Sequence, residues 1–542
     1  MPEGRGPHGV IAGIIDARLG SDSLFTERTV TEQINVKRVL VRNTAWNYVG
    51  FAVNLGTNFV LFPYVVHRIG DAAAGIWLLL GSVTGYMGLL ELGLVPSLAQ
   101  SVAADSGRGN RQGLNEAAST TLTILCALAA IPLLTLFAVP RLVQILQVPP
   151  GLQEQAQIVF RVAICGFALR MPLATFQAIL LGTQRQDRCN QLWILVVAAK
   201  FLGAVCLLLT GFGLVAIVTM EALVHLGAGI PQSRWAFGEV PGLKLRPRLA
   251  SLTRARALVS FGGTLLVLSV CSLVSEQTNR LVIAGFLPVA MVTYFSAGGK
   301  LYQVAYSVPT TLVQAVSPLA AHLHGRGDHA GLRVLFLRMT KYTTGLAWPL
   351  VLSLGFCAAF LLRAWMGRPF AAHFRVVQVL VVAFAVAAYN HAGYSILVGT
   401  KRIGPVLWRY QLPQAAITFT LSVWLVGRLG VVGVAMATTV PAVLLEGVFL
   451  SFLLSEVGVG WAEFFRLVVL PTAGPAVVAY APLGIAYSLL NVDSIALLAV
   501  AALSSVLYAV LFWRFSLNPS ERAELFAHAP VANRLLSPRL ET

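Results

Sequence analysis

The chain has 542 residues, of which 57% are hydrophobic and only 11% are charged, and its formal net charge is +17. Soluble domains carry roughly 25% charged residues, so this chain lacks the polar surface that several globular domains would need. A nucleic-acid-binding protein needs a solvated basic face, whereas a membrane protein places its excess of Lys and Arg on one side of the bilayer. The composition therefore favours a membrane protein and argues against a nucleic-acid partner.

The first 43 residues are polar and mixed in charge. They contain no apolar run long enough for a secretory signal, so we expect residues 1–43 to form a cytoplasmic tail. The six cysteines of the chain show no CxxC or Cys/His spacing. Neither a metal site nor a disulfide framework is therefore predicted.

Fourteen apolar segments follow this tail, and each is long enough to cross a bilayer, which takes about 20 residues. They lie near 45–66, 75–101, 117–139, 156–182, 190–210, 213–233, 258–284, 289–319, 342–362, 376–398, 405–426, 430–453, 467–490 and 494–514. No connection between them reaches the roughly 50 residues that an independent domain needs. The expected fold class is therefore an all-α polytopic membrane protein with about 14 transmembrane helices.

The Lys and Arg residues between the segments predict the orientation of the chain. With the N-terminus inside, the cytoplasmic segments hold 26 of them and the outer segments hold 6. This asymmetry predicts that both termini are cytoplasmic and that the protein spans the plasma (inner) membrane many times. After Phe515, Asn518 and Pro519 predict the cap and first turn of a helix in the C-terminal tail.

Two pairs of short segments indicate an internal duplication. Residues 107–114 match 325–332 at five of eight positions, and residues 179–185 match 396–402 at five of seven positions. The offsets are 218 and 217 residues, so the repeat unit holds six spans in parallel orientation, with two spans added afterwards. Parallel repeats with a substrate site between them are a known transporter plan, although short Gly-Arg loops can also recur through composition alone.

We therefore divide the chain into two parallel six-helix lobes, two further helices and their connections. The predicted parts are the N-terminal tail (1–43), the N-lobe (44–235), a cytoplasmic linker (236–257), the C-lobe (258–454), the last two spans (455–515) and a cytoplasmic C-terminal tail (516–542).

Three stretches of this chain resemble a known transporter family. Gly75–Leu94, Asn279–Phe286 and Ser317–Asp328, together with the arrangement of six, six and two spans, resemble the polysaccharide transport branch of the multidrug/oligosaccharidyl-lipid/polysaccharide (MOP) exporter superfamily. The resemblance covers about residues 40–515. It implies a flippase that carries undecaprenyl-pyrophosphate-linked oligosaccharide, a repeat unit of O-antigen, capsule or exopolysaccharide, across the bacterial inner membrane.

Charged residues inside a membrane are costly, on the order of 3 kcal/mol each, and often mark function. The embedded cations are Arg161, Arg170, Lys200, Arg280, Lys300, Lys341 and Arg409, and the embedded acids are Glu91, Glu221, Glu276 and Glu446. Among the acids, Glu91 and Glu276 are candidates for coupling to H+ or Na+. A structural hydrogen bond for Glu91 and a structural pair of Glu276 with Arg280 are the alternatives.

The eighth segment carries seven polar residues at helical spacing. They are Ser296, Lys300, Gln303, Ser307, Thr310, Gln314 and Ser317. Lipid cannot satisfy such a stripe, so it faces either a wet cavity or neighbouring helices. In the first segment Asn47, Asn54 and Asn58 form a related stripe, whose amides suit sugar hydroxyls but also hold helices together.

The predicted substrate-binding residues are Arg170, Arg280, Lys300, Gln303, Ser307, Asn47, Asn54 and Asn58. The arginines and the lysine would hold the pyrophosphate, the amides would contact sugars, and the two lobes would alternate in access. We expect no catalytic residue and no cofactor beyond a coupling ion. The partners would be membrane lipid, the lipid-linked oligosaccharide, and a polysaccharide polymerase or glycosyltransferases.

Two other functions are weighed against this one. A cation-coupled multidrug exporter of the same superfamily would favour acidic cavities, and the embedded cations here outnumber the acids by seven to four. A polyprenyl-dependent membrane glycosyltransferase or polymerase would need larger outer loops with catalytic acids or histidines. The expectation is therefore a transporter and not an enzyme.

Overall fold

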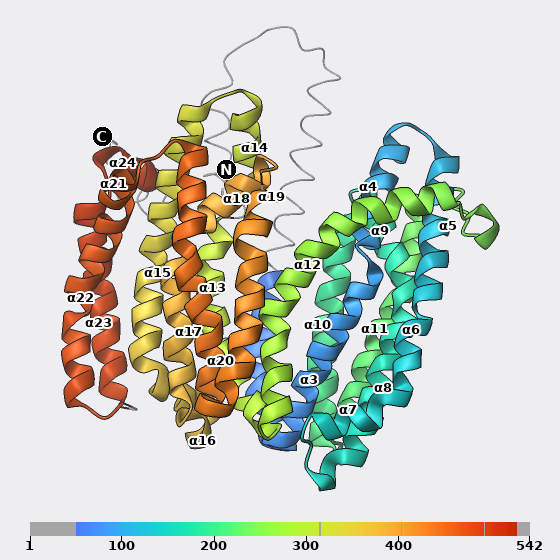
Figure 1. Cartoon of the computed structure of the whole chain (residues 1–542), viewed down its shortest axis with the longest axis horizontal. Coiled ribbons are helices and arrows are strands. Elements are labelled where there is room, and N and C mark those ends of the chain that lie inside the picture. The colour runs from blue at the N-terminus through green and yellow to red at the C-terminus, as the bar shows by residue number, and fades with distance from the viewer. Residues whose placement is uncertain (1–49, 314–315, 403, 493, 528–542) are drawn as a thin grey trace, which may run out of the picture.

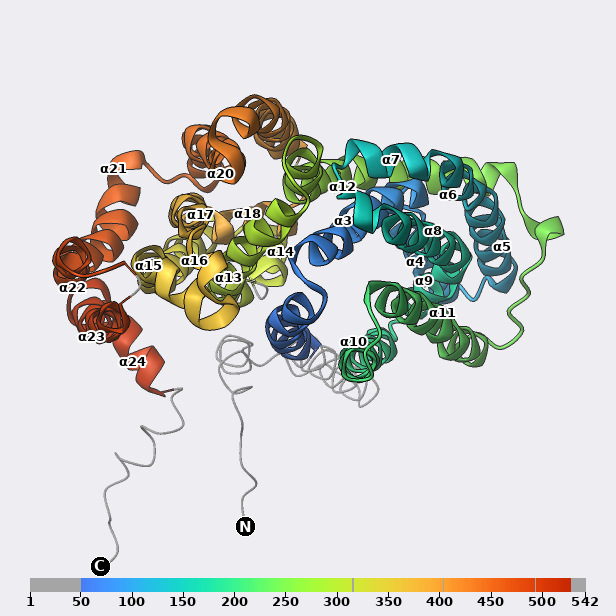
Figure 2. The same cartoon turned by 90° about the horizontal axis from the view of Figure 1, so that it is seen from below.

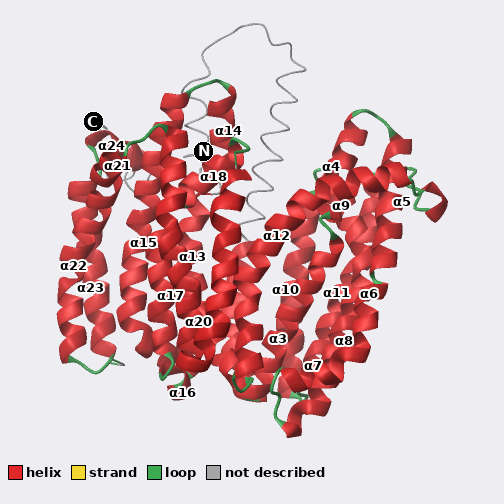
Figure 3. Cartoon of the chain, viewed as in Figure 1, coloured by secondary structure: helices red, strands yellow, loops and turns green. Residues whose placement is uncertain are grey.

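The computed structural model describes residues 50–313, 316–402, 404–492 and 494–527 (Figure 1). It does not describe the side chains of residues 261–265, 267–269, 271–272, 274–276 and 524–527. Within the described ranges every regular element is a helix, and Figure 3 shows no strand. The predicted all-α class is thus confirmed, whereas Asn47 and most of both predicted tails lie outside the described residues.

The first bundle holds the helices that precede residue 240. They are a helix over residues 50–69, α3 (Asp71–Met87), the 3-10 turn Gly88–Glu91, α4 (Leu94–Gly107), α5 (Arg111–Leu128), α6 (Ala130–Leu134), α7 (Val139–Ile145), α8 (Gln153–Arg170), α9 (Ala174–Gly182), α10 (Gln186–Leu209) and α11 (Leu214–Glu239).

The second bundle holds most of the later helices, and α12 (Leu252–Phe286) slants across the junction between the two bundles (Figures 1 and 2). These helices are α13 (Ala290–Val313), α14 (Val316–Gly325), α15 (His329–Met366), α16 (Arg368–Ala371), α17 (Phe374–Ala387), α18 (His391–Gly399), α19 (Gly404–Val406), a π-helical segment (Leu407–Gln411), α20 (Leu412–Val457), α21 (Trp461–Phe464), α22 (Leu470–Leu489), α23 (Ile495–Leu511) and α24 (Pro519–Ala527).

The predicted spans correspond to helices of the structure when the long helix α20 is counted as two spans and each broken helix as one. Nine helical stretches of the described chain are long and apolar enough to cross a membrane, and the bent pair α17–α18 makes ten. Gly430 has φ 59° and ψ −141°, so it divides α20 into two spans; a residue with a side chain is strained at such a φ. The helix over 50–69, α12 and α13–α14 complete the fourteen.

The duplicated loops have the same local structure in both halves. Asn110 caps α5 by accepting from Gly113 N at 2.9 Å, and Asp328 caps α15 by accepting from Gly331 N at 2.7 Å. A side-chain oxygen at this position satisfies a backbone N–H that the helix leaves unpaired. The residue before each cap is a glycine, Gly109 or Gly327, with φ values of 66° and 69° respectively.

The second pair of matched segments is equivalent in three dimensions as well. Arg185 pairs with Glu239 at 2.8 Å, and Arg402 pairs with Glu456, which lies 217 residues after Glu239. Gly182 and Gly399 also occupy the same place in the two halves. A Cβ on Gly182 would meet the carbonyl oxygen of Ala99, and one on Gly399 would collide with that of Ser317. These shared contacts favour duplication over chance similarity of composition.

The two bundles meet along α3, which packs against α12 and α13. The apolar core is continuous across this junction, since Phe62 and Ile76 of the first bundle belong to the same cluster as Ala297 and Phe384 of the second. Gly75 allows the closest approach, because a Cβ there would collide with the carbonyl oxygen of Val289. The domain boundaries at residues 235, 257 and 454 stay a prediction.

Candidate functional site

Two of the predicted cations lie at the junction of the two bundles. Lys300 of α13 places its Nζ 4.9 Å from the ring centre of Phe62, which belongs to the helix over 50–69. Arg280 of α12 lies close enough for its charge to act on Lys300. Lys300 is half-buried, as is Arg280. Two cations of successive helices that act on each other repel, and a nearby anion would relieve this repulsion.

Polar groups of α3 and α12 lie beside Arg280. Arg280 Nη1 donates to Gln277 Oε1 at 3.2 Å, and Ser82 Oγ donates to the same oxygen at 2.9 Å. Tyr86 and Thr278 share a hydrogen bond one residue further along α12. The amide of Gln277 thus connects the first bundle to the Arg280 guanidinium, a connection that helix periodicity alone does not predict.

The polar stripe of α13 does not have one uniform environment. Ser296 and Ser307 are buried, Lys300 and Thr310 are half-buried, and Gln303 is exposed. Ser307 Oγ donates to the Val304 carbonyl at 2.7 Å, so this hydroxyl is satisfied within its own helix. The structure therefore brings Lys300 to the junction, whereas Ser307 is occupied by a local contact.

The remaining amides of the predicted site lie on the first described helix. Asn58 is exposed, and its Nδ2 donates at 2.8 Å both to the Asn54 carbonyl and to Asn54 Oδ1. Their amides are thus linked to each other along the helix. Asn47 lies outside the described residues, as does the side chain of Glu276.

Arg170 and Glu91 form a second charged group inside the first bundle. The charge of Arg170 acts on Glu91 and on His225 of α11. Lys200 pairs with Glu221 at 3.4 Å and also acts on His225. His225 was missed by the sequence reasoning, although a histidine within an apolar span is a usable signal. Arg170 and Lys200 thus both act on His225 within the first bundle, whereas Arg280 and Lys300 lie at the junction.

The bundles are held together on the α16 side by contacts between their ends. Tyr294 Oη donates to Asp71 Oδ2 at 2.6 Å, and Thr293 Oγ1 donates to the Asp71 carbonyl at 2.7 Å. His373, between α16 and α17, stacks on Tyr294 with ring centres 4.6 Å apart. Burial lowers the pKa of His373, so the neutral imidazole fits this contact. We call Asp71, Thr293, Tyr294 and His373 the α16-side contact.

A second aromatic contact joins the same ends. Trp365 at the end of α15 stacks on Phe59 with ring centres 4.5 Å apart, and its Nε1 donates to the Phe59 carbonyl at 3.0 Å. In Figure 1 the α16 end lies at the bottom, whereas the α4–α5 and α14–α15 connections and α24 lie at the top. The junction is thus fastened at the end away from α24.

A buried polar pair within the second bundle was not predicted as a site. Asn390, before α18, donates through Nδ2 to Glu446 Oε2 of α20 at 2.8 Å. Glu446 is 5% exposed and Asn390 is 8% exposed. The sequence shows Glu446 as an embedded acid, but it does not show that residues 56 positions apart meet.

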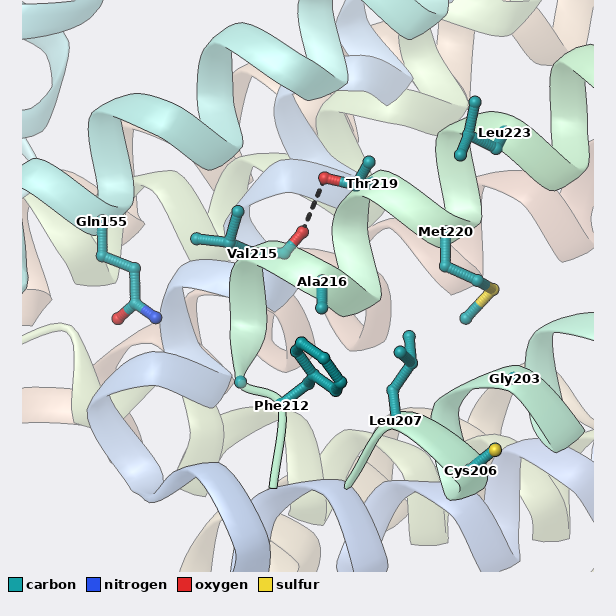
Figure 4. A pocket seen from close by; sticks show the side chains of 11 residues that line it. Gln155, Gly203, Cys206, Leu207, Phe212, Val215, Ala216, Thr219, Met220 and Leu223 are labelled. Atoms are coloured by element: carbon teal, nitrogen blue, oxygen red, sulfur yellow. Dashed lines mark hydrogen bonds between the residues drawn. The ribbon is translucent and has the colours of Figure 1, made fainter. Parts of the chain in front are cut away.

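A cavity of about 680 Å³ between α10 and α11 contains none of the predicted site residues (Figure 4). Its wall is mostly apolar and includes Leu207, Phe212 and Met220. The Thr219 hydroxyl on this wall donates to the Val215 carbonyl at 2.8 Å, so it offers no free donor. Besides this threonine, the polar side chains on the wall are Gln155 and Cys206, and none of the lining residues is charged.

Comparison with known proteins places the chain in a transporter family. The family described as "Polysaccharide biosynthesis protein" matches residues 91–374. A curated relative, the "Putative O-antigen transporter" of Shigella flexneri, is 19% identical over 429 residues, which cover 76% of this chain and 97% of the relative.

Solved structures show the same fold at low sequence identity. The lipid II flippase MurJ in an inward closed conformation has a TM-score of 0.68 at 11% identity, covering 88% of this chain and 99% of that chain. A multidrug resistance MATE family transporter in an inward-facing conformation has a TM-score of 0.65 at 14% identity, covering 75% and 94%. The membrane enzyme considered above is excluded, because the relatives are transporters. The chain is a multi-pass membrane protein that belongs to the polysaccharide biosynthesis family of transporters, within the MOP superfamily.

Proposed function

We propose that this protein flips undecaprenyl-pyrophosphate-linked oligosaccharide from the cytoplasmic to the periplasmic leaflet of the bacterial inner membrane by alternating access. The observation that carries the proposal is the pair Arg280 and Lys300 at the junction of the bundles. A pyrophosphate is the part of such a lipid that two adjacent cations bind, and an arginine can hold it through two parallel hydrogen bonds.

The arrangement of the bundles supports alternating access. Two bundles with equivalent loops and ion pairs can rock against each other about a central axis. The α16-side contact fastens one end, whereas the first bundle and the helices α14 and α18 lie apart in Figure 1 at the α24 end. We propose that the α24 end is cytoplasmic, since the loops with most Lys and Arg lie there.

The other predicted residues have different roles in this proposal. Gln303 is exposed on the same helix as Lys300 and is suited to contact sugar hydroxyls. Asn54 and Asn58 can exchange their mutual hydrogen bond for one to a sugar. Arg170 remains a candidate for the pyrophosphate path, and Glu91 beside it remains a candidate for H+ or Na+ coupling, as does Glu276. A polymerase or glycosyltransferases would act on the same lipid.

The proposal is tested by complementation of a strain that lacks its own polysaccharide flippase. Lys300→Ala and Arg280→Ala should each abolish export while the protein stays in the membrane. Arg161→Ala is the matched control, because this embedded arginine is exposed and donates to Gln157 on its own helix. Full export by both junction variants would contradict the proposal.

A further inference from the structure

The Glu446–Asn390 pair lies deep in the second bundle and is incompletely satisfied. Asn390 donates to Glu446 Oε2, but Glu446 Oε1 is buried and has no hydrogen-bond partner within the described part of the chain. The groups that act on the carboxyl are Asn390 and the hydroxyl of Tyr410 in the π-helical segment; both favour the ionised form as hydrogen-bond donors, and neither is a cation. A carboxylate that is buried in a membrane protein without a cation is strongly disfavoured.

The equivalent place in the first bundle shows that the fold does not need this pair. Residues 217 positions earlier are Leu173 and Gly229. These two residues also touch, since a Cβ on Gly229 would collide with the Leu173 side chain. The same contact between two helices is thus made by apolar atoms in the first bundle, whereas the second bundle has an acid and an amide there. Packing alone does not account for them.

A neighbouring histidine connects the pair to the substrate helix. His391 follows Asn390 and is 8% exposed, and both its ring nitrogens lack a hydrogen-bond partner within the described residues. Its ring meets that of Tyr306 of α13 edge-on, with centres 4.9 Å apart. Tyr306 directly precedes Ser307 of the polar stripe in the chain and also acts on Tyr410. Within the described residues, the titratable group that acts on Glu446 is therefore Tyr410, with Tyr306 behind it, and His391 adjoins Asn390 in the chain.

We propose that Glu446 is a proton-binding site that couples a proton gradient to the movement of α13. Hydronium on one side of the membrane gives its proton to Glu446 Oε1, so one O–H bond of hydronium breaks as the Oε1–H bond forms. The Oε1–H bond breaks when a water molecule on the other side takes the proton and becomes hydronium. A metal cation would need several oxygen ligands, whereas Asn390 turns its N–H toward the carboxyl. The coupling role rests on the proposed flippase function, but proton binding does not.

Proton binding is tested first, by infrared spectroscopy of the full purified chain at several pH values. The wild type should show absorption of a protonated carboxyl that Glu446→Gln removes and Glu456→Gln keeps. Glu456 is the matched control because it lies on the same helix and pairs with Arg402. Asn390→Leu removes a hydrogen-bond donor that stabilises the ionised carboxylate of Glu446. The signal of the protonated carboxyl should therefore persist to higher pH in this variant. The proposal would be overturned if Glu446→Gln kept the protonated-carboxyl signal of the wild type. It would also be overturned if Na+, at constant ionic strength, stabilised the wild type against heat but did not stabilise Glu446→Gln.

Coupling is tested in proteoliposomes that contain lipid-linked oligosaccharide and carry a pH gradient. The wild type should flip faster with the gradient than without it, and Glu446→Gln should flip at one rate in both conditions. A gradient effect that survives in Glu446→Gln overturns the coupling role of Glu446. A wild type that fails to flip at all contradicts the proposed function instead, and the infrared result separates the two failures.

Discussion

The α16-side contact makes a quantitative prediction about the balance between the two conformations. The hydrogen bond from Tyr294 to Asp71 joins the two bundles at 2.6 Å and ends on a carboxylate. A hydrogen bond to a charged group contributes about 1.5–3 kcal/mol, which corresponds to a factor of roughly 10 to 150 in an equilibrium. If this bond exists only while the α16 end is closed, Tyr294→Phe should shift the population toward the open end by that factor.

The shift is measurable as a distance between spin labels on the two bundles. Labels at Arg141 of α7 and Arg368 of α16 would report it, because both residues are exposed and both helices lie at the bottom of Figure 1. Tyr480→Phe is the control, since its hydroxyl bonds to Ser353 and Ser505 within one bundle. Equal distance distributions in wild type and Tyr294→Phe would refute the reasoning.

Three further predictions concern stability and pH. Lys341 is buried and pairs with Glu521 at 2.6 Å, so Glu521→Gln leaves the lysine without a counter-charge. The free energy of unfolding, measured by thermal unfolding, should fall by about 3–5 kcal/mol. Gly399→Ala should lower the melting temperature, because its Cβ would collide with the Ser317 carbonyl oxygen. Burial lowers the pKa of His373 in the closed end, so protonation of His373 favours the open end. The contribution of His373 to the closed conformation should therefore be complete above about pH 6.5 and weaken below it, and the spin-label distance measures this change.

Each of these has a control in the same chain. Glu463→Gln breaks an ion pair with Arg333 that is partly exposed, so it should cost at most about 1 kcal/mol. Gly404→Ala adds a Cβ that meets nothing within 4 Å, and it should leave the melting temperature unchanged. His373→Gln should remove the pH dependence of the closed end. Equal effects of a variant and its control would contradict the corresponding explanation.

The sequence predicts the fold of this chain well, because the membrane restricts the possible structures so strongly. Apolar length is sufficient to find spans, since only helices of about 20 residues satisfy their backbone in lipid. The repeat was found through Gly109 and Gly327, whose positive φ values tolerate few other residues. The start of α24 at Pro519 was also predicted. The Gly430 turn was visible only as a short gap between two spans.

The candidate site is less predictable, because it depends on contacts between helices. Helix periodicity placed Ser307 in the same stripe as Lys300, but it could not show that the Ser307 hydroxyl turns back to its own helix. The sequence shows Lys341 as an embedded cation, but it does not show that Lys341 is buried against Glu521 of the C-terminal helix α24. Periodicity likewise cannot pair Asn390 with Glu446, because their distance in space depends on how two helices pack.

The central claim is that the Arg280–Lys300 junction moves a pyrophosphate-linked glycan across the membrane. Its most direct test is the rate at which purified protein in vesicles exposes labelled undecaprenyl-pyrophosphate-linked oligosaccharide to an enzyme added outside. The wild type and Arg161→Ala should flip the lipid, whereas Lys300→Ala and Arg280→Ala should leave it at the rate of protein-free vesicles. Flipping by the junction variants at the wild-type rate would contradict the account.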